Sequence, residues 1–300
     1  MTRLAFGCGP AGGAGPQHRE EALAALVTAW EGGVRWFDTA PSYGDGHGEE
    51  LLGEALRRLP RSGVRVSTKV GRVRMAISDP YRAADGPRRE PLFDFTAAGV
   101  RDSVARSVRR LGVEHLDAVL VHDPENHLEQ ALDEAFPALR RLRDEGVVGS
   151  VGVGTTSVPA ARRLVAVGAV DTVMIAGAWS LTRREAAPLL EECREAGVGV
   201  LAAAPFDSGL LASDHPGPSA RYLYRAAPQD VLERVRTMAR VCRAHGTRLP
   251  QAALWFPLRH PAVRLVVAGM CTRSEVRQNL RWLAEPPPEA LWEELDALPG

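Results

Sequence analysis

The sequence has few of the features that mark secreted, membrane-embedded or nucleic-acid-binding proteins. Its 300 residues include four widely spaced cysteines, which form neither a CxxC pair nor the cysteine–histidine spacing of a zinc site. Disulfides and metal sites are therefore not expected, and we predict a reducing, cytoplasmic location. The 37 basic and 37 acidic residues cancel, so the net charge favours neither nucleic acid nor an anionic membrane as a partner.

Long apolar runs and a dinucleotide-binding glycine motif are also missing. No apolar stretch reaches the roughly 18 residues of a membrane span, and the apolar run at the N-terminus is too short for a signal peptide. The glycine-rich segment 7–13 contains Pro10, and its spacing does not fit G-x-G-x-x-G, so we interpret it as a loop. These absences argue against an open, doubly wound nucleotide-binding sheet.

The sequence does contain a regular alternation of short β-branched runs and longer helical patterns. The predicted strands are Leu4–Gly7, Val34–Asp38, Val64–Val70, Leu116–His122, Val147–Gly154, Thr172–Ala176, Val198–Ala204 and Val263–Ala268. The predicted helices are Glu20–Trp30, Gly48–Arg58, Ala97–Leu111, Leu132–Glu145, Pro159–Val167, Arg183–Ala196 and Asp230–His245. Because eight strands alternate with helices and the composition does not break, we predict a single α/β domain over residues 1–300, a (β/α)8 TIM barrel.

Two long irregular segments interrupt this alternation. Residues 72–95 follow the third predicted strand, and residues 206–228 follow the seventh. Both are strand-to-helix connections, which lie on the side of a barrel where active sites are built. Since connections of this length usually have a function, we expect both to border the active site and to set the substrate.

Polar residues stand at or just after the ends of three predicted strands, and they are Asp38, Tyr43, Lys69 and His122. The C-terminal ends of barrel strands open into one bowl, so these side chains can converge. Hydride transfer to a carbonyl needs a proton donor, and the reverse reaction needs a base in the same place. A neighbouring ammonium lowers the pKa of a phenol and prepares it for both tasks. A carboxylate would hold the ammonium, and an imidazole would bind the reacting oxygen.

Each of these residues also has an ordinary structural interpretation. A strand-end aspartate often caps the next helix, a tyrosine in a turn is usually an amphipathic plug, and a lone histidine is more often structural than catalytic. Lys69 is harder to explain in this way. It lies in a strand that should be buried on both faces, where an unpaired ammonium is unfavourable. The combination therefore favours a catalytic set.

Three segments resemble the signature regions of the aldo-keto reductases: FDTAPSYG at 37–44, STKVGR at 67–72 and LVHDP at 120–124. The resemblance extends from the first strand to Asn279. These segments and FDSGLL at 206–211 are most similar to the aldose and galactose dehydrogenase branch of that family. The resemblance implies a tetrad in which Tyr43 is the acid/base, assisted by Lys69, Asp38 and His122. It also implies a nicotinamide cofactor stretched across the barrel mouth without a Rossmann fold.

The resemblance further implies where the adenosine end of this cofactor binds. Segment 269–279 has the family spacing, and the residues assigned to cofactor binding there are Gly269, Thr272, Glu275 and Asn279. Glu275 stands where NADPH-dependent members often have a cationic or amide residue, and a carboxylate repels a phosphate. We therefore expect NAD or NADP, with a preference for NAD. NADP stays an alternative because Arg273 or Arg277 could bind its phosphate. The other interpretation of Glu275 is that it stabilises the first turn of a helix.

The remaining cofactor contacts depart from the family pattern. Thr155 stands where an asparagine often binds the carboxamide, and its hydroxyl can still donate one hydrogen bond. Phe206 is a candidate for the contact with the nicotinamide ring, because Ala203 replaces the usual stacking tyrosine. The backbone N–H groups of Ser208, Gly209 and Leu210 are candidates for binding the pyrophosphate, since the glycine lets the chain approach closely.

These observations predict an NAD(P)-dependent oxidoreductase that acts on a sugar hemiacetal, an alcohol or a carbonyl. The expected partner is a small-molecule substrate, with neither nucleic acid nor membrane, and the oligomeric state stays open. One alternative is an NADPH-dependent aldehyde or ketone reductase, because one tyrosine serves both directions of the reaction. A second alternative is a non-catalytic, nucleotide-binding regulatory subunit. The sequence shows no large apolar stripe for a partner, which argues against the second alternative.

Overall fold

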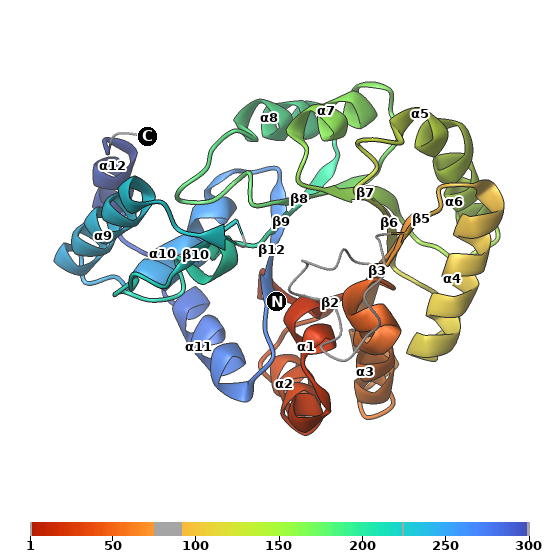
Figure 1. Cartoon of the computed structure of the whole chain (residues 1–300), viewed down its shortest axis with the longest axis horizontal. Helices are drawn as coiled ribbons and strands as arrows, with labels where there is room; N and C mark the ends of the chain where they lie inside the picture. Colours follow the sequence, from red (N-terminus) through yellow and green to blue (C-terminus); the bar gives the residue numbers. More distant parts are fainter. Residues whose placement is uncertain (1, 75–91, 224, 299–300) are drawn as a thin grey trace.

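A closed, fully parallel barrel of eight strands forms the centre of the molecule (Figure 1). The computed structural model describes residues 2–74, 92–223 and 225–298. The barrel strands are β1 (Leu4–Gly7), β2 (Trp36–Asp38), β3 (Arg65–Val70), β6 (Ala118–His122), β7 (Val151–Thr155), β8 (Thr172–Ala176), β9 (Gly199–Ala203) and β12 (Val263–Gly269). The ring closes where β1 pairs with both β2 and β12. The predicted (β/α)8 barrel is confirmed, and each strand overlaps its predicted range.

Helices surround this barrel and cover its outer face (Figure 1). They are α2 (Arg19–Glu31), α3 (His47–Leu56), α4 (Ala97–Leu111), α6 (Phe136–Asp144), α7 (Val158–Ala166), α8 (Ala187–Glu195), α10 (Leu249–Trp255) and α11 (Arg273–Ala284). Shorter or additional helices are α1 (Gly9–Gly13), η1 (Pro16–His18), η2 (Tyr43–Gly46), η3 (Arg61–Gly63), α5 (Leu128–Gln130), η4 (Ala131–Ala135), η5 (Asp207–Gly209), α9 (Gln229–Ala244), η6 (Phe256–Arg259) and α12 (Glu289–Asp296). None of the helices in the described chain is both long and apolar enough to cross a membrane.

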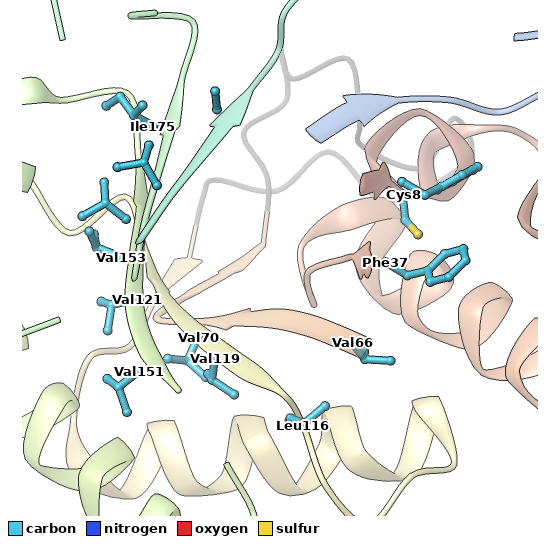
Figure 2. Close-up of a cluster of buried hydrophobic side chains, with 14 of the residues drawn as sticks. Cys8, Phe37, Val66, Val70, Leu116, Val119, Val121, Val151, Val153 and Ile175 are labelled. Carbon is cyan, nitrogen blue, oxygen red and sulfur yellow. The ribbon is translucent and has the colours of Figure 1, made fainter. Parts of the chain in front are cut away.

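Alternation along the strands divides the buried side chains into two sets. One set points outward and packs between the strands and the helices, as Val119, Val121, Val151 and Val153 do in Figure 2. The other set points inward and fills the barrel, and it includes Ala5, Leu120, Met174, Leu201 and Val267. A residue two positions after an inward residue also points inward. Polar side chains at inward positions near the strand ends therefore face the mouth of the barrel.

Proline residues explain the two clearest differences between the observed and the predicted helices. The helix expected from Arg183 begins at Ala187, because Pro188 is tolerated in a first turn but not in a helix interior. The helix expected over Leu132–Glu145 is preceded by the π-helical turn η4, directly before Pro137. Proline has no N–H and crowds the carbonyl four residues earlier, and a wider turn relieves that conflict.

Both long connections contain short antiparallel pairs. In the first, β4 (Arg72–Arg74) pairs with β5 (Leu92–Phe93), and residues 75–91 lie outside the described residues. In the second, η5 is followed by β10 (Arg221–Tyr222) and β11 (Arg225–Ala226). A second apolar cluster formed by α9, α10 and α12 receives Leu210 and Leu211, which anchors the beginning of this connection. Both connections leave the C-terminal ends of barrel strands.

Candidate active site

The four residues predicted to act together line one cavity of about 180 Å³ at the C-terminal mouth of the barrel. Asp38 ends β2, Lys69 lies near the end of β3, His122 ends β6, and Tyr43 begins η2. The register of β2 and β3 pairs Asp38 with Ser67, so Lys69 lies one inward position nearer the mouth than Ser67. Strand order and register therefore bring together four side chains that span 85 positions of sequence, from Asp38 to His122.

A buried ion pair lies at the base of this cavity. The Lys69 Nζ atom donates to Asp38 Oδ2 at 2.7 Å and to the carbonyl of Thr39 at 2.9 Å, and the two side chains are 2% and 3% exposed. The second carboxylate oxygen, Asp38 Oδ1, accepts from the Ser67 hydroxyl at 2.8 Å, which accepts from Trp36 Nε1 at 2.9 Å. Buried charges persist only when they are paired and hydrogen-bonded in this way.

The phenol ring of Tyr43 lies beside both the ammonium of Lys69 and the imidazole of His122. The Lys69 Nζ atom is 4.7 Å from the centroid of the Tyr43 ring. The ring of His122 meets it edge-on, with 6.1 Å between the centroids. The turn that follows Tyr43 depends on Gly44, which has φ +61° and lies so close to Gly12 that a Cβ would sit 2.0 Å from its carbonyl oxygen. This contact fixes the turn, and with it Tyr43, over the barrel mouth.

Burial and two neighbouring cations keep His122 neutral. Burial lowers the pKa of His122 well below its ordinary value of 6.5, and the charges of Lys69 and Arg72 lower it further. Within the described residues, the Nδ1 atom of His122 is buried without a hydrogen-bond partner. A neutral imidazole carries one N–H, which can donate to a substrate oxygen without competing for the proton of Tyr43.

A second cavity, of about 430 Å³, adjoins the first and has the size of an ordinary small-molecule cofactor site. The two cavities share Pro10, Ala204 and Gly269 in their walls. Of the residues predicted to bind the cofactor, the second cavity is lined by Phe206, Ser208, Gly209, Gly269, Glu275 and Asn279. Because they share part of their walls, the two cavities together extend from the ion pair to the beginning of α11, and we call them the trough.

Three of the predicted cofactor residues have other contacts. Thr155 lines the catalytic cavity, but its hydroxyl donates to Glu125 at 3.0 Å and accepts from the amide of Ser157 at 2.9 Å. Leu210 lies outside the cavity wall: its side chain is buried, and its amide donates to the carbonyl of Asp207 at 3.3 Å. Thr272 is the N-cap of α11.

Comparison with known proteins agrees with this geometry. A model of the Aldo/keto reductase family matches residues 3–299. The chain belongs to this family. It is 40% identical to D-threo-aldose 1-dehydrogenase from Pseudomonas sp over 92% of this chain and 87% of that protein. It is 32% identical to pyridoxal 4-dehydrogenase from Microbacterium luteolum over 97% and 92% of the two chains.

Solved structures show the same fold. The glycerol dehydrogenase of Gluconobacter oxydans superimposes with a TM-score of 0.80 at 22% identity, covering 98% of this chain and 90% of that one. As a member of the aldo/keto reductase family, the protein is an NAD(P)-dependent oxidoreductase.

The charges around the second cavity of this aldo/keto reductase are mostly negative. Glu275 lines the cavity and also accepts from the amides of Cys271 and Thr272 at 2.8 and 2.9 Å, which closes a capping box on α11. Glu275 therefore lines the cavity and also stabilises the first turn of α11. Arg273 pairs with Glu21 at 2.9 Å, and neither Arg273 nor Arg277 contributes to the cavity wall.

Arg221, Asp207 and Trp282 also line this cavity and were not predicted. The signal in the sequence was weak for each of them. Arg221 lies in a long connection with several other polar residues, and Trp282 looks like one of many apolar positions on its helix. Asp207 stands in the loop whose backbone amides were assigned to the pyrophosphate. No neighbouring residue in the sequence indicates the position of its side chain, because its hydrogen-bond donors Ser180 and Thr182 lie on another connection.

Asp207 is a buried carboxyl in the wall of the cofactor cavity. It is 2% exposed, has φ +46°, and accepts hydrogen bonds from Ser180 at 2.8 Å and from Thr182. Burial raises its pKa from 3.8 to about 6, although both hydroxyl donors act in the opposite direction. The folded state therefore binds a proton at Asp207 more tightly than the unfolded chain does, so ionisation of this group destabilises the fold.

This shift predicts a pH dependence that Asp207→Asn should remove. Between pH 4 and 6 the unfolded chain releases the proton first, so Asp207 lowers the free energy of unfolding as the pH rises. The variant keeps an oxygen that accepts from Ser180 and Thr182, and asparagine tolerates a positive φ. We expect the difference in free energy of unfolding between variant and wild type to increase by on the order of 3 kcal/mol from pH 4 to pH 7.

Urea denaturation across this pH range measures the difference. The exposed Asp230→Asn serves as control, and a difference that stays constant with pH contradicts the prediction.

Proposed function

We propose that this aldo/keto reductase oxidises the hemiacetal carbon of an aldose, with Tyr43 as the acid/base. The observation that carries the proposal is the buried Lys69–Asp38 pair beside the Tyr43 ring, 2.7 Å between Nζ and Oδ2 and 4.7 Å from Nζ to the ring centroid. The sugar class is supported by the 40% identical D-threo-aldose 1-dehydrogenase. We assign the substrate to the cavity of about 180 Å³ that these side chains line.

In this proposal the chain's own residues move and hold the proton. The Lys69 ammonium stabilises the negative charge of a Tyr43 phenolate, which accepts the proton of the substrate hydroxyl. Asp38 pairs with Lys69 and fixes its position. The neutral His122 donates a hydrogen bond to the same substrate oxygen. In the reverse direction the Tyr43 hydroxyl returns the proton to a carbonyl oxygen, so one set of residues serves both directions.

The cofactor belongs in the cavity of about 430 Å³, where Phe206, Ser208, Gly209, Gly269 and Asn279 would hold it. When bound, the nicotinamide supplies or accepts the hydride. Thr155 is assigned to its carboxamide, which would replace a hydrogen bond now made with Glu125 or Ser157. The carboxylate of Glu275 at the far end of this cavity favours NAD, because a 2′-phosphate there would face a like charge.

The alternative function is that of an NADPH-dependent aldehyde or ketone reductase. The observation in its favour is Arg221, a cationic side chain that lines the same cavity as Glu275. Arginine binds phosphate well, so the charge balance between these two residues decides the choice of cofactor.

Replacing Tyr43 by phenylalanine tests the acid/base assignment. We expect Tyr43→Phe to lower kcat on aldoses by at least about 100-fold, because it removes the proton-transfer group and little volume. The affinity for NAD should change less than about twofold, as followed by the fluorescence of the six tryptophans. Tyr222→Phe, outside both cavities, is the matched control. Full activity in Tyr43→Phe would refute the assignment.

Replacing Glu275 by glutamine tests the preference for NAD. Glutamine keeps the capping box on α11, since Gln and Glu both serve at this position, but it removes the charge. We expect the Kd for NADP to decrease about 3- to 10-fold and that for NAD to stay within about twofold, as expected for a partly screened like-charge contact. Both are measured by tryptophan fluorescence titration, with the exposed Glu293→Gln as control. If wild type prefers NADP, or the variant leaves the Kd for NADP unchanged, our interpretation of Glu275 is wrong.

A further inference from the structure

A second ion pair, between Arg72 and Asp123, borders the catalytic cavity, and the proton transfer described above involves it only through the effect of the Arg72 charge on His122. The Arg72 Nη1 atom donates to Asp123 Oδ2 at 2.6 Å, and the two side chains are 16% and 20% exposed. Both residues line the same cavity as Tyr43 and His122. The side chain of Arg72 therefore lies in the wall of the catalytic cavity.

The backbone holds each member of this pair in an unusual conformation. Gly71 has φ +93°, and a Cβ there would lie 2.1 Å from the Phe95 ring, so the turn that leads into Arg72 requires glycine. Asp123 has φ +49°, and its amide donates to the carbonyl of Gly154 at 2.9 Å. A non-glycine residue with positive φ is uncommon and is often found at a functional site. Both strand ends are therefore built to turn these side chains toward the cavity.

The second pair lies next to the reacting centre. The Asp123 Oδ2 atom is 3.7 Å from His122 Nε2. An oxygen bound by His122 and a neighbouring oxygen bound by Asp123 would thus belong to adjacent carbon atoms of one small molecule. A vicinal diol or an α-hydroxy carbonyl has this arrangement of oxygens.

The charges around the cavity argue for a neutral ligand. Lys69 is compensated by Asp38, and Arg72 is compensated by Asp123. A carboxylate or phosphate on the substrate would find no uncompensated cation among these four residues. A hydroxyl group, in contrast, both donates and accepts, so it can accept from the guanidinium and donate to the carboxylate.

The environment of Asp123 leaves room for a further donor. Arg72 is the one side chain among the described residues that donates a hydrogen bond to this carboxylate. Burial raises the pKa of Asp123, although the charge of Arg72 acts against it. A substrate hydroxyl that donates to Asp123 would stabilise its ionised form.

We propose that Arg72 and Asp123 form a specificity site for the hydroxyl group on the carbon next to the reacting carbon, and that the site selects neutral polyhydroxylated substrates. This inference rests on the proposed function, because it places the reacting carbon between Tyr43 and His122. It extends that function by naming the residues that distinguish a sugar from a simple aldehyde of the same length.

The test compares glyceraldehyde with propanal, two aldehydes of three carbons that differ in their hydroxyl groups. In Arg72→Met, the ratio of kcat/KM for glyceraldehyde to kcat/KM for propanal should fall about 10-fold or more, mainly through KM, since hydrogen bonds to charged groups are among the strong ones. Asp123→Asn should lower the same ratio, and asparagine suits the positive φ. Arg225→Met, on β11, is the matched control for the loss of an arginine and should leave the ratio unchanged.

The outcomes distinguish this inference from the proposed function. The ratio stays the same if a variant changes kcat/KM for neither substrate, or changes it equally for both. If this is found for both variants, Arg72 and Asp123 are not a hydroxyl-binding site. A wild-type enzyme that prefers glyceraldehyde 3-phosphate to glyceraldehyde contradicts the selection for neutral substrates. If wild type has no turnover that depends on Tyr43 with any aldehyde or aldose, the proposed function fails, and this inference fails with it.

Discussion

The interaction on which the rest of the site depends is the buried pair of Lys69 and Asp38. A lysine inside a barrel is tolerated only with a partner, and here every polar atom of the pair has one, down to the indole N–H of Trp36. The pair exists because β2 and β3 are neighbours in a register that sets Asp38 beside Ser67. Its positive end lies beneath the Tyr43 ring and also contributes to the neutrality of His122. One ion pair thus lies beside both groups that would contact the reacting oxygen.

The pairing of charges differs between the two ends of the trough. Each cation at the catalytic end has its own carboxylate, whereas the far end carries Glu275 and Asp207 with Arg221. A neutral substrate suits the first region, and in our proposal the charge of Glu275 against that of Arg221 sets the choice of cofactor in the second. The catalytic cavity and the adjoining cavity are therefore distinct regions, although both lie at the ends of parallel strands, as sites in barrels generally do.

The sequence allowed the barrel to be predicted from periodicity, and the tetrad from polar residues at strand ends together with the resemblance to the family signature that contains Tyr43. Short β-branched runs mark the strands, and a polar residue at a strand end must face the mouth or a helix. The rest depends on contacts between distant residues. Arg273 pairs with Glu21, 252 positions away, and this pairing holds it outside the cavity. Arg72 lines the cavity and follows a turn in which Phe95 occupies the space beside Gly71. Neither contact is visible as a local pattern in the sequence. The π-helical turn before Pro137 is a separate case, in which one residue changes a regular helix.

The most direct test is a spectroscopic titration of the Tyr43 phenol. The chain has four tyrosines, so the difference in phenolate absorbance between wild type and Tyr43→Phe isolates this one. The same difference is then measured with Asp38→Asn and Lys69→Met combined, which removes the ion pair without leaving a buried charge unpaired. We predict that Tyr43 ionises below the pH of about 10 that is typical of a free tyrosine, and that loss of the pair raises this pH. An ionisation of Tyr43 that does not respond to the loss of Lys69 would contradict the central role of the pair.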